Sequence, residues 1–393
     1  MRGLFGVLAA LVVETIWAVA PTITDVTAQQ RYPWNGKVDI AYTVVGDIAG
    51  YALTNGLITT LKVTATDKVA NNTYTAATAA LSGATTLESG KHAIVWDLDQ
   101  QGVDLKSANV VFNVSCEASE ALFCVIDLSA GAEAESYPVS YLVDIPEGGW
   151  TDEYKTDKLV LRRCSAGSFI MGDNQLSEAH RVILTKPFYM GVFEVTQKQW
   201  KLVMGSDPCS STSYGRGDDY PVHYVSYNMI RGSSDGALWP SSAAVDATSF
   251  LGKLQARTKL NFDLPTDAQW EYACRAGTTT YYYWGNSMDG DYAWYKSNSS
   301  SKSHPVGAKK PNAWGLYDMS GNVWECCLDW YSSSLAYGTD PKGPSSGVDR
   351  VSRTGGWIHD GALCASSYRG HDYPSSRNGD NNDLGLRLSR TLP

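Results

Sequence analysis

Residues 312–325 read NAWGLYDMSGNVWE and are the longest of several distinctive motifs in the second part of the chain. This stretch combines tryptophan with glycine, asparagine and aspartate, which are residue types typical of turns. Ten of the 13 tryptophans lie at or beyond residue 150, separated by Gly, Ser, Asn and Asp. A compact domain keeps long loops of this kind only when aromatic packing, metal ions or disulfides hold them. We therefore predict an α+β domain with few helices and much irregular chain around this stretch.

Three helices are expected upstream of this stretch, each with its own start signal. Thr196 suits an N-cap position, and Thr266 with Gln269 forms a capping-box pattern. Apolar residues fall near one helical face after residues 241–242. The expected helices lie at about 196–205, 243–254 and 266–277. Beyond residue 278 we expect short strands and long loops.

Several further motifs accompany the opening stretch in a fixed order. They read GSFIMG (167–172), FYMG (188–191), EVT (194–196), LPTDAQWEY (264–272) and LGLR (384–387). With residues 312–325, this series resembles the formylglycine-generating enzyme, or sulfatase-modifying factor, family over about residues 158–389. The resemblance implies a C-type-lectin-like fold, with helices around a small antiparallel sheet. It also implies that function must be judged from the site, because the family contains both copper-dependent oxidases and noncatalytic binding proteins.

The C-terminal segment bears on catalysis. In the family's oxidases, two cysteines hold Cu(I) at the spacing that His359 and Cys364 have here. Cys364 matches the second position and is the candidate catalytic residue, but His359 replaces the first cysteine. Cu(I) favours paired thiolates, so we do not expect copper. Alternatively, His359 is a loop residue and Cys364 a disulfide partner or a buried thiol.

The resemblance also implies a calcium site within residues 318–325. Its ligands would be the side-chain oxygens of Asp318 and Glu325 and the backbone carbonyls of Gly321 and Val323. Ca²⁺ binds several hard oxygen ligands and tolerates irregular geometry. The alternative is a polar turn whose two acids are solvated or cap the backbone.

The first part of the chain has a different character. Between residues 21 and 130 the sequence is rich in Thr, Val and Ala, and apolar residues alternate with polar ones at 38–44, 61–65 and 110–116. Turn signals occur at Asn35-Gly36, Asn55-Gly56, Ser82-Gly83 and Ser89-Gly90. Such a pattern is typical of an antiparallel sandwich. We predict an Ig-like β-sandwich over 21–130, a linker over 131–155 and a sulfatase-modifying-factor-like domain over 156–393.

The N-terminus has the pattern of an export signal. A basic start precedes the apolar run 4–13 and the small residues 18–20, which predicts a signal peptide over 1–20 and a secreted, cell-surface or periplasmic protein. The alternative is an uncleaved N-terminal anchor. The eight cysteines are an even number, which predicts disulfides in an oxidising compartment. Of the adjacent Cys326 and Cys327, at most one is expected to pair within the core, because neighbours on a strand point to opposite faces.

Composition limits the partners. With 32 basic and 41 acidic residues, the net charge of −9 excludes nucleic acid as an expected partner. The 23 tyrosines and 13 tryptophans supply rings with polar groups, which suit recognition surfaces. Residues 281–284 with Trp294 and Tyr295 are the candidate aromatic surface for a protein or glycan, or for self-association. Aromatic packing in place of regular structure is the alternative.

These observations favour an exported noncatalytic binding or assembly protein. The first alternative is a formylglycine-generating oxidase, or another enzyme on the same scaffold. The second alternative is a structural surface or filament subunit, in which exposed strands or aromatic patches would stack.

Overall fold

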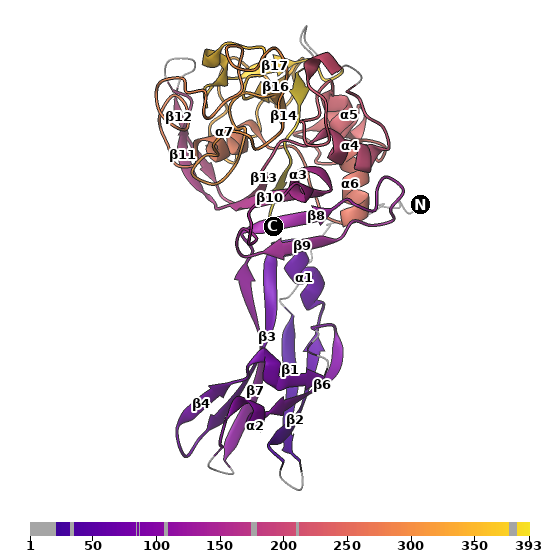
Figure 1. Cartoon of the computed structure of the whole chain (residues 1–393), viewed down its shortest axis with the longest axis vertical. Coiled ribbons are helices and arrows are strands. Elements are labelled where there is room, and N and C mark those ends of the chain that lie inside the picture. The colour runs from indigo at the N-terminus through magenta and orange to yellow at the C-terminus, as the bar shows by residue number, and fades with distance from the viewer. Residues whose placement is uncertain are drawn as a thin grey trace, which may run out of the picture. The chain divides into compact units, whose positions relative to one another are not determined.

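The computed structural model describes residues 21–31, 35–83, 85, 87–105, 109–173, 179–209, 212–376 and 383–393 (Figure 1). The predicted signal peptide over residues 1–20 lies outside the described residues. Contacts divide the chain into two units between Ser119 and Glu120. The chain is a mixed α+β protein, with mostly short sheets and few helices. Among the described residues, each helix is too short or too polar to cross a bilayer.

The first unit contains two β-sheets and two short helices. Its strands are β1 (Thr22–Gln30), β2 (Lys37–Val45), β3 (Leu57–Asp67), β4 (Asn72–Thr75), β5 (Leu81–Gly83), β6 (Gly90–Asp97) and β7 (Val110–Glu120). They form the sheets β1-β2-β6-β5 and β4-β3-β7. The helices are α1 (Ile48–Asn55), α2 (Leu98–Gln101) and the 3₁₀ turn η1 (Thr78–Ala80). The Ig-like topology stays a prediction.

The core of this unit follows from the alternation in its strands. Val38, Ile40, Tyr42 and Val44 of β2 are all buried, while their neighbours are more exposed. They meet buried residues of β6 and of the second sheet in one apolar core. The predicted strand over 38–44 is thus confirmed.

Helix α1 was not predicted, because Asn55-Gly56 was interpreted as a turn between strands. Asp47 caps the start of this helix by accepting a hydrogen bond from Gly50 N. Gly56 ends it with φ 63°. A glycine in the left-handed region ends a helix as readily as it turns a hairpin, so the local sequence alone did not distinguish the two.

The second unit is built on three sheets. The largest has the order β19-β13-β10-β8-β9, with β8 (Phe123–Asp127), β9 (Val139–Leu142), β10 (Lys158–Cys164), β13 (Phe188–Gly191) and β19 (Ser389–Thr391). The second is β11-β12-β15, with β11 (Gly167–Met171), β12 (His180–Leu184) and β15 (Gly338–Thr339). The third is β17-β16-β14-β18, with β14 (Trp324–Trp330), β16 (Arg350–Arg353), β17 (Gly370–Asp372) and β18 (Leu384–Gly385).

The division between the units lies earlier than the predicted end of the first domain at 130. Strand β8 pairs with β10 along Phe123–Asp127, and β9 pairs with β8. Both strands therefore belong to the second unit, although the sequence placed them in the sandwich and the linker. The pairing of β8 with β10 joins residues on either side of the predicted linker, so local composition did not reveal it.

Helices α4 (Gln197–Met204) and α7 (Asp267–Arg275) are present where they were predicted. The helix expected at about 243–254 is present as α6 (Phe250–Thr258), but it begins later, because Ser249 caps it by accepting from Gly252 N. Capping boxes at Thr196 and Thr266 start α4 and α7. The additional helices are α3 (Glu153–Thr156), α5 (Tyr227–Arg231) and the 3₁₀ turns η2 (Thr212–Tyr214), η3 (Asp235–Leu238) and η4 (Gly361–Cys364). Helix α7 packs against β11, β14 and β16. Figure 1 shows α7 beside β11. The helix places Trp270 in the core.

All eight cysteines lie in the described part of the chain, and each is free. The structure therefore does not show the predicted disulfides. Cys326 and Cys327 are both free and both buried, although neighbours on a strand point to opposite faces. The physical reason is that β14 is buried on both faces over residues 324–329.

Candidate functional site

The segment that the resemblance associates with copper follows β16 in a tight turn. Thr354 and Gly355 have φ values of 84° and 71°. A Cβ atom at Gly356 would lie 2.0 Å from the Asp383 carboxylate oxygen Oδ2. The absence of a side chain at Gly356 therefore lets the backbone lie close to Asp383. This approach brings the following residues, including His359, beside Asp383.

His359 is held by two neighbours through one ring atom. Its Nδ1 lies 3.2 Å from Trp324 Nε1 and 3.2 Å from Asp383 Oδ2. Trp324 Nε1 is a donor only, so that contact requires Nδ1 to accept, whereas a contact with the carboxylate requires Nδ1 to donate. The two contacts thus belong to different tautomers or protonation states of the imidazole, since a neutral ring carries its proton on either nitrogen. In either state, Nδ1 has a protein partner.

Cys364 lies at the end of η4 in an aromatic cluster. Its side chain is fully buried and belongs to a small core cluster with Tyr282 and Ala365. The partly buried rings of Tyr281 and Tyr368 pack against this cluster. Burial raises the pKa of the Cys364 thiol to about 12. The thiol is therefore protonated near neutral pH, whereas a metal ligand must be the thiolate. Among the described residues, no hydrogen bond or ion pair joins Cys364 to His359.

The predicted calcium segment forms a turn whose carbonyls converge. Thr354 Oγ1 lies 3.1 Å from Gly321 O, 3.0 Å from Val323 O and 2.6 Å from Gly355 O. A hydroxyl group donates one hydrogen, so it satisfies one of these three acceptors at a time. The surplus of carbonyl oxygens at this point is the feature of the turn that fits a cation.

The carboxylate of Glu325 is engaged elsewhere. Arg387 Nε lies 3.0 Å from each of its oxygens, and Arg387 Nη2 lies 2.7 Å from Oε1. Trp270 Nε1 donates to Oε2 at 2.6 Å. Both charged side chains are fully buried. These donors fill most of the acceptor capacity of the carboxylate, so binding of a cation by Glu325 would compete with them.

Asp318 is buried close to the same charges. Its Oδ2 accepts a hydrogen bond from Gly307 N at 2.6 Å, and burial raises its pKa to about 6 against the effects of Gly307 and Arg387. Asp318, Gly321 and Val323 lie in the loop before β14, whereas Glu325 lies in the strand itself. Within the described residues, no group of three or more His, Cys, Asp or Glu side chains is arranged to hold a metal ion.

Sequence reasoning missed Glu194 as a member of this site. Its carboxylate accepts hydrogen bonds from Asn322 Nδ2 at 2.7 Å and from Val323 N at 3.1 Å. Burial first, and then the charge of Asp318, raises the pKa of Glu194 well above its ordinary value. Glu194 lies in the EVT motif and Arg387 in the LGLR motif. A charged residue within each of these otherwise uncharged motifs was the sequence signal that could have indicated a buried charge.

The candidate aromatic surface is only partly a surface. Tyr282 and Tyr283 are buried. Trp284 stacks between Tyr282 and Tyr292, with ring centroids 4.7 and 5.1 Å apart. Much of the run 281–284 is therefore packing, and binding at its exposed edges stays a prediction.

This combination of fold, ordered motifs and buried Glu325–Arg387 pair defines a sulfatase-modifying-factor type of domain. Residues 152–392 match the family model of the sulfatase-modifying factor enzyme 1-like domain. The chain belongs to this family, and the resemblance noted from the motifs is confirmed.

Individual relatives include proteins with different names. The chain is 30% identical over 271 residues to the chaperone protein LppX of Paenibacillus barcinonensis, covering 60% of this chain and 90% of that protein. It is 27% identical over 250 residues to the formylglycine-generating enzyme of Mus musculus, covering 52% of this chain and 66% of that enzyme. Among solved structures, Treponema denticola variable protein 1 has 29% identity and a TM-score of 0.50, covering 60% of this chain and 96% of that chain.

Proposed function

We propose that this protein is an exported, noncatalytic binding or assembly protein built on a formylglycine-generating-enzyme-like domain. The observation that carries the proposal is the residue pair His359 and Cys364. Cys364 is a single thiol buried among aromatic rings, and His359 stands at the position of the family's first cysteine. One thiol and one imidazole make a poor Cu(I) site, because soft Cu(I) favours paired thiolates.

The names of two relatives support a noncatalytic role. LppX is named a chaperone and the Treponema protein is named a variable protein, and neither name describes an oxidase. The formylglycine-generating enzymes among the relatives support the alternative, an oxidase on the same scaffold. Copper binding separates the two proposals.

The direct test is a Cu(I) titration of the full chain without oxygen, in competition with a chromophoric chelator. We expect no stoichiometric site that depends on Cys364. The Cys364→Ala variant is the matched control, because copper that this variant still binds does not belong to the family's site. Stoichiometric Cu(I) that disappears in the variant would contradict the proposal and favour an oxidase.

Export is a separate part of the proposal and rests on the sequence of residues 1–20. Mass spectrometry of native material should show a chain that lacks about the first twenty residues. A full-length chain recovered only from cytosol would contradict it. Assembly into a surface or filament subunit stays the third prediction, and electron microscopy of the purified protein would reveal it.

A further inference from the structure

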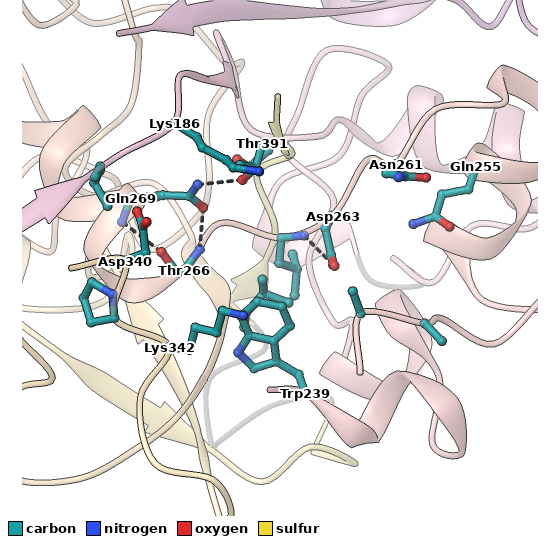
Figure 2. A pocket seen from close by; sticks show the side chains of 17 residues that line it. Lys186, Trp239, Gln255, Asn261, Asp263, Thr266, Gln269, Asp340, Lys342 and Thr391 are labelled. Carbon is teal, nitrogen blue, oxygen red and sulfur yellow. Dashed lines mark hydrogen bonds between the residues drawn. The ribbon is translucent and has the colours of Figure 1, made fainter. Parts of the chain in front are cut away.

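A second candidate site lies in the same domain, formed by other residues than the copper and calcium segments. A cavity of about 620 Å³ is bordered by the end of β12, the segment after β15, the end of α6, the start of α7 and strand β19. Figure 2 shows its side chains. The volume lies within the range of about 300–1,000 Å³ that is usual for small-molecule sites.

Two lysines border this cavity without a carboxylate partner. Lys186 and Lys342 both line it and are exposed, and both residues are labelled in Figure 2. Among the described residues, no ion pair involves either lysine. Lys342 Nζ lies 5.4 Å from the ring centroid of Trp239.

The two acids of the cavity, in contrast, are engaged by the protein. Asp263 accepts from Arg231 Nε at 2.7 Å and from Nη2 at 2.9 Å, and Arg231 is fully buried. Asp340 accepts from the backbone N of Thr185 at 2.9 Å and from the Thr185 hydroxyl. The charged groups left without a protein partner at the cavity are therefore the two lysines, beside amide side chains that both donate and accept.

Two buried polar atoms of the lining add to this surplus of donors. Trp239 Nε1 and Ser389 Oγ have no hydrogen-bond partner, and both residues are at least nine-tenths buried. An indole N–H can only donate. Buried polar groups are nearly always paired, so an unpaired group beside a cavity indicates a missing partner such as a ligand or water.

We infer that this cavity binds a small ligand that carries a carboxylate group. The ammonium groups of Lys186 and Lys342 would pair with the carboxylate, and neutral acceptors of the ligand would take the hydrogen bonds of Trp239 and Ser389. A cationic ligand would meet two unpaired lysines, and a neutral ligand would leave both to the solvent. This inference rests on the proposed binding function and names the chemistry of its ligand.

The test is isothermal titration calorimetry of the full chain with two matched pairs of probes. Hippurate and its neutral amide represent a peptide-like source of the carboxylate, and glucuronate and glucose represent a sugar source. We expect one acid to bind at least tenfold more tightly than its neutral partner, and more weakly as salt rises. The acid that binds identifies the source.

The Lys186→Gln and Lys342→Gln double variant should bind that acid at least tenfold more weakly. Lys201→Gln, an exposed lysine of α4 outside the cavity, is the control and should bind as the wild type does. Unchanged melting temperatures would show that both variants fold.

Three results would overturn the inference. They are equal binding of an acid and its neutral partner, unchanged binding by the double variant, and no binding of either acid up to about 10 mM, well above the range of specific sites. In the last case water satisfies Trp239 and Ser389. None of these results bears on Cys364, so the copper titration would still judge the noncatalytic proposal separately.

Discussion

Arg387 and Glu325 form a fully buried ion pair in which Arg387 Nη2 lies 2.7 Å from Glu325 Oε1. The guanidinium also donates to Gly191 O at 2.9 Å and to Tyr317 O at 2.8 Å. The pair therefore joins the LGLR motif to strand β13 and to the turn before β14. It accounts physically for two of the motifs that define the family.

Replacing Arg387 by Met should destabilise the second unit by about 3–5 kcal/mol, because it leaves the buried carboxylate of Glu325 without its partner. Glu194 and Asp318 lie near the same charge and would increase the loss. Urea unfolding measures the effect. Lys158→Met, which breaks the more exposed pair with Glu153, is the control and should cost about 1 kcal/mol or less. A loss as small as that of the control would show that the Arg387 pair contributes little.

Asp329 should make the stability of the second unit depend on pH. Burial, and then the charge of Asp267, raises the pKa of Asp329 to about 7 from an ordinary value of 3.8, against lowering by Asp267 N–H, Arg369 and Arg353. Between these values the folded state holds a proton that the unfolded state releases, so stability falls as pH rises from about 4 to about 7. Above pH 7 the penalty is fully present.

Asp329→Asn removes this titration while its amide oxygen still accepts from Asp267 N. The variant should therefore gain stability relative to the wild type as pH rises from 5 to 8, by up to about 1.4 kcal/mol for each pKa unit removed. Unfolding curves at several pH values measure the difference. The same change at exposed Asp291 is the control. A difference that does not vary with pH would show that Asp329 does not titrate in this range.

Cysteine alkylation tests the free thiols. Seven of the eight cysteines are buried and Cys116 is half-buried, so a neutral alkylating reagent should label the native chain at Cys116 first. Cys364 should resist labelling because its pKa is about 12. After unfolding without reductant, all eight should be labelled. Fewer than eight would show disulfides, as the sequence had predicted.

Calcium binding by the turn around Asp318 is tested by chelation. The convergent carbonyls of Gly321 and Val323 support an ion, and we expect a chelator to lower the melting temperature. An ion at a hundredfold excess over Kd stabilises by about 2.7 kcal/mol. Asp318→Asn, which keeps an acceptor for Gly307 N, should reduce the effect of calcium, and Glu153→Gln should not. An unchanged melting temperature would mean that Glu325, Arg387 and Thr354 hold the turn without calcium.

The parts of the fold that the sequence predicted are those with local signals. Thr196 and Thr266 cap α4 and α7 with groups three residues away, so both helices could be located. Strand β8 had no such signal, because its partner β10 is defined by distant residues. The boundary between the two units depends on which strands pair with one another, and the local preference of residues for strands does not reveal this pairing.

In the candidate site, too, the sequence predicted what lies in one local stretch and missed what distant residues contribute. Asp318, Gly321, Val323 and Glu325 lie in one short stretch, so the motif placed them together. Arg387 reaches Glu325 from 62 residues away, and no local pattern indicated that the ligand candidate was already paired. The cavity between β12 and β19 combines residues from 184 to 391, which only the folded chain brings together.

The central claim is that this domain does not oxidise cysteine, and mass spectrometry of a sulfatase-type cysteine peptide tests it most directly. The full chain, loaded with Cu(I) and supplied with oxygen and a thiol reductant, would be incubated with the peptide beside the Cys364→Ala variant. We expect that neither protein forms an aldehyde that a hydrazide can trap. If the wild type formed aldehyde in the presence of oxygen and the Cys364→Ala variant did not, the noncatalytic proposal would be contradicted.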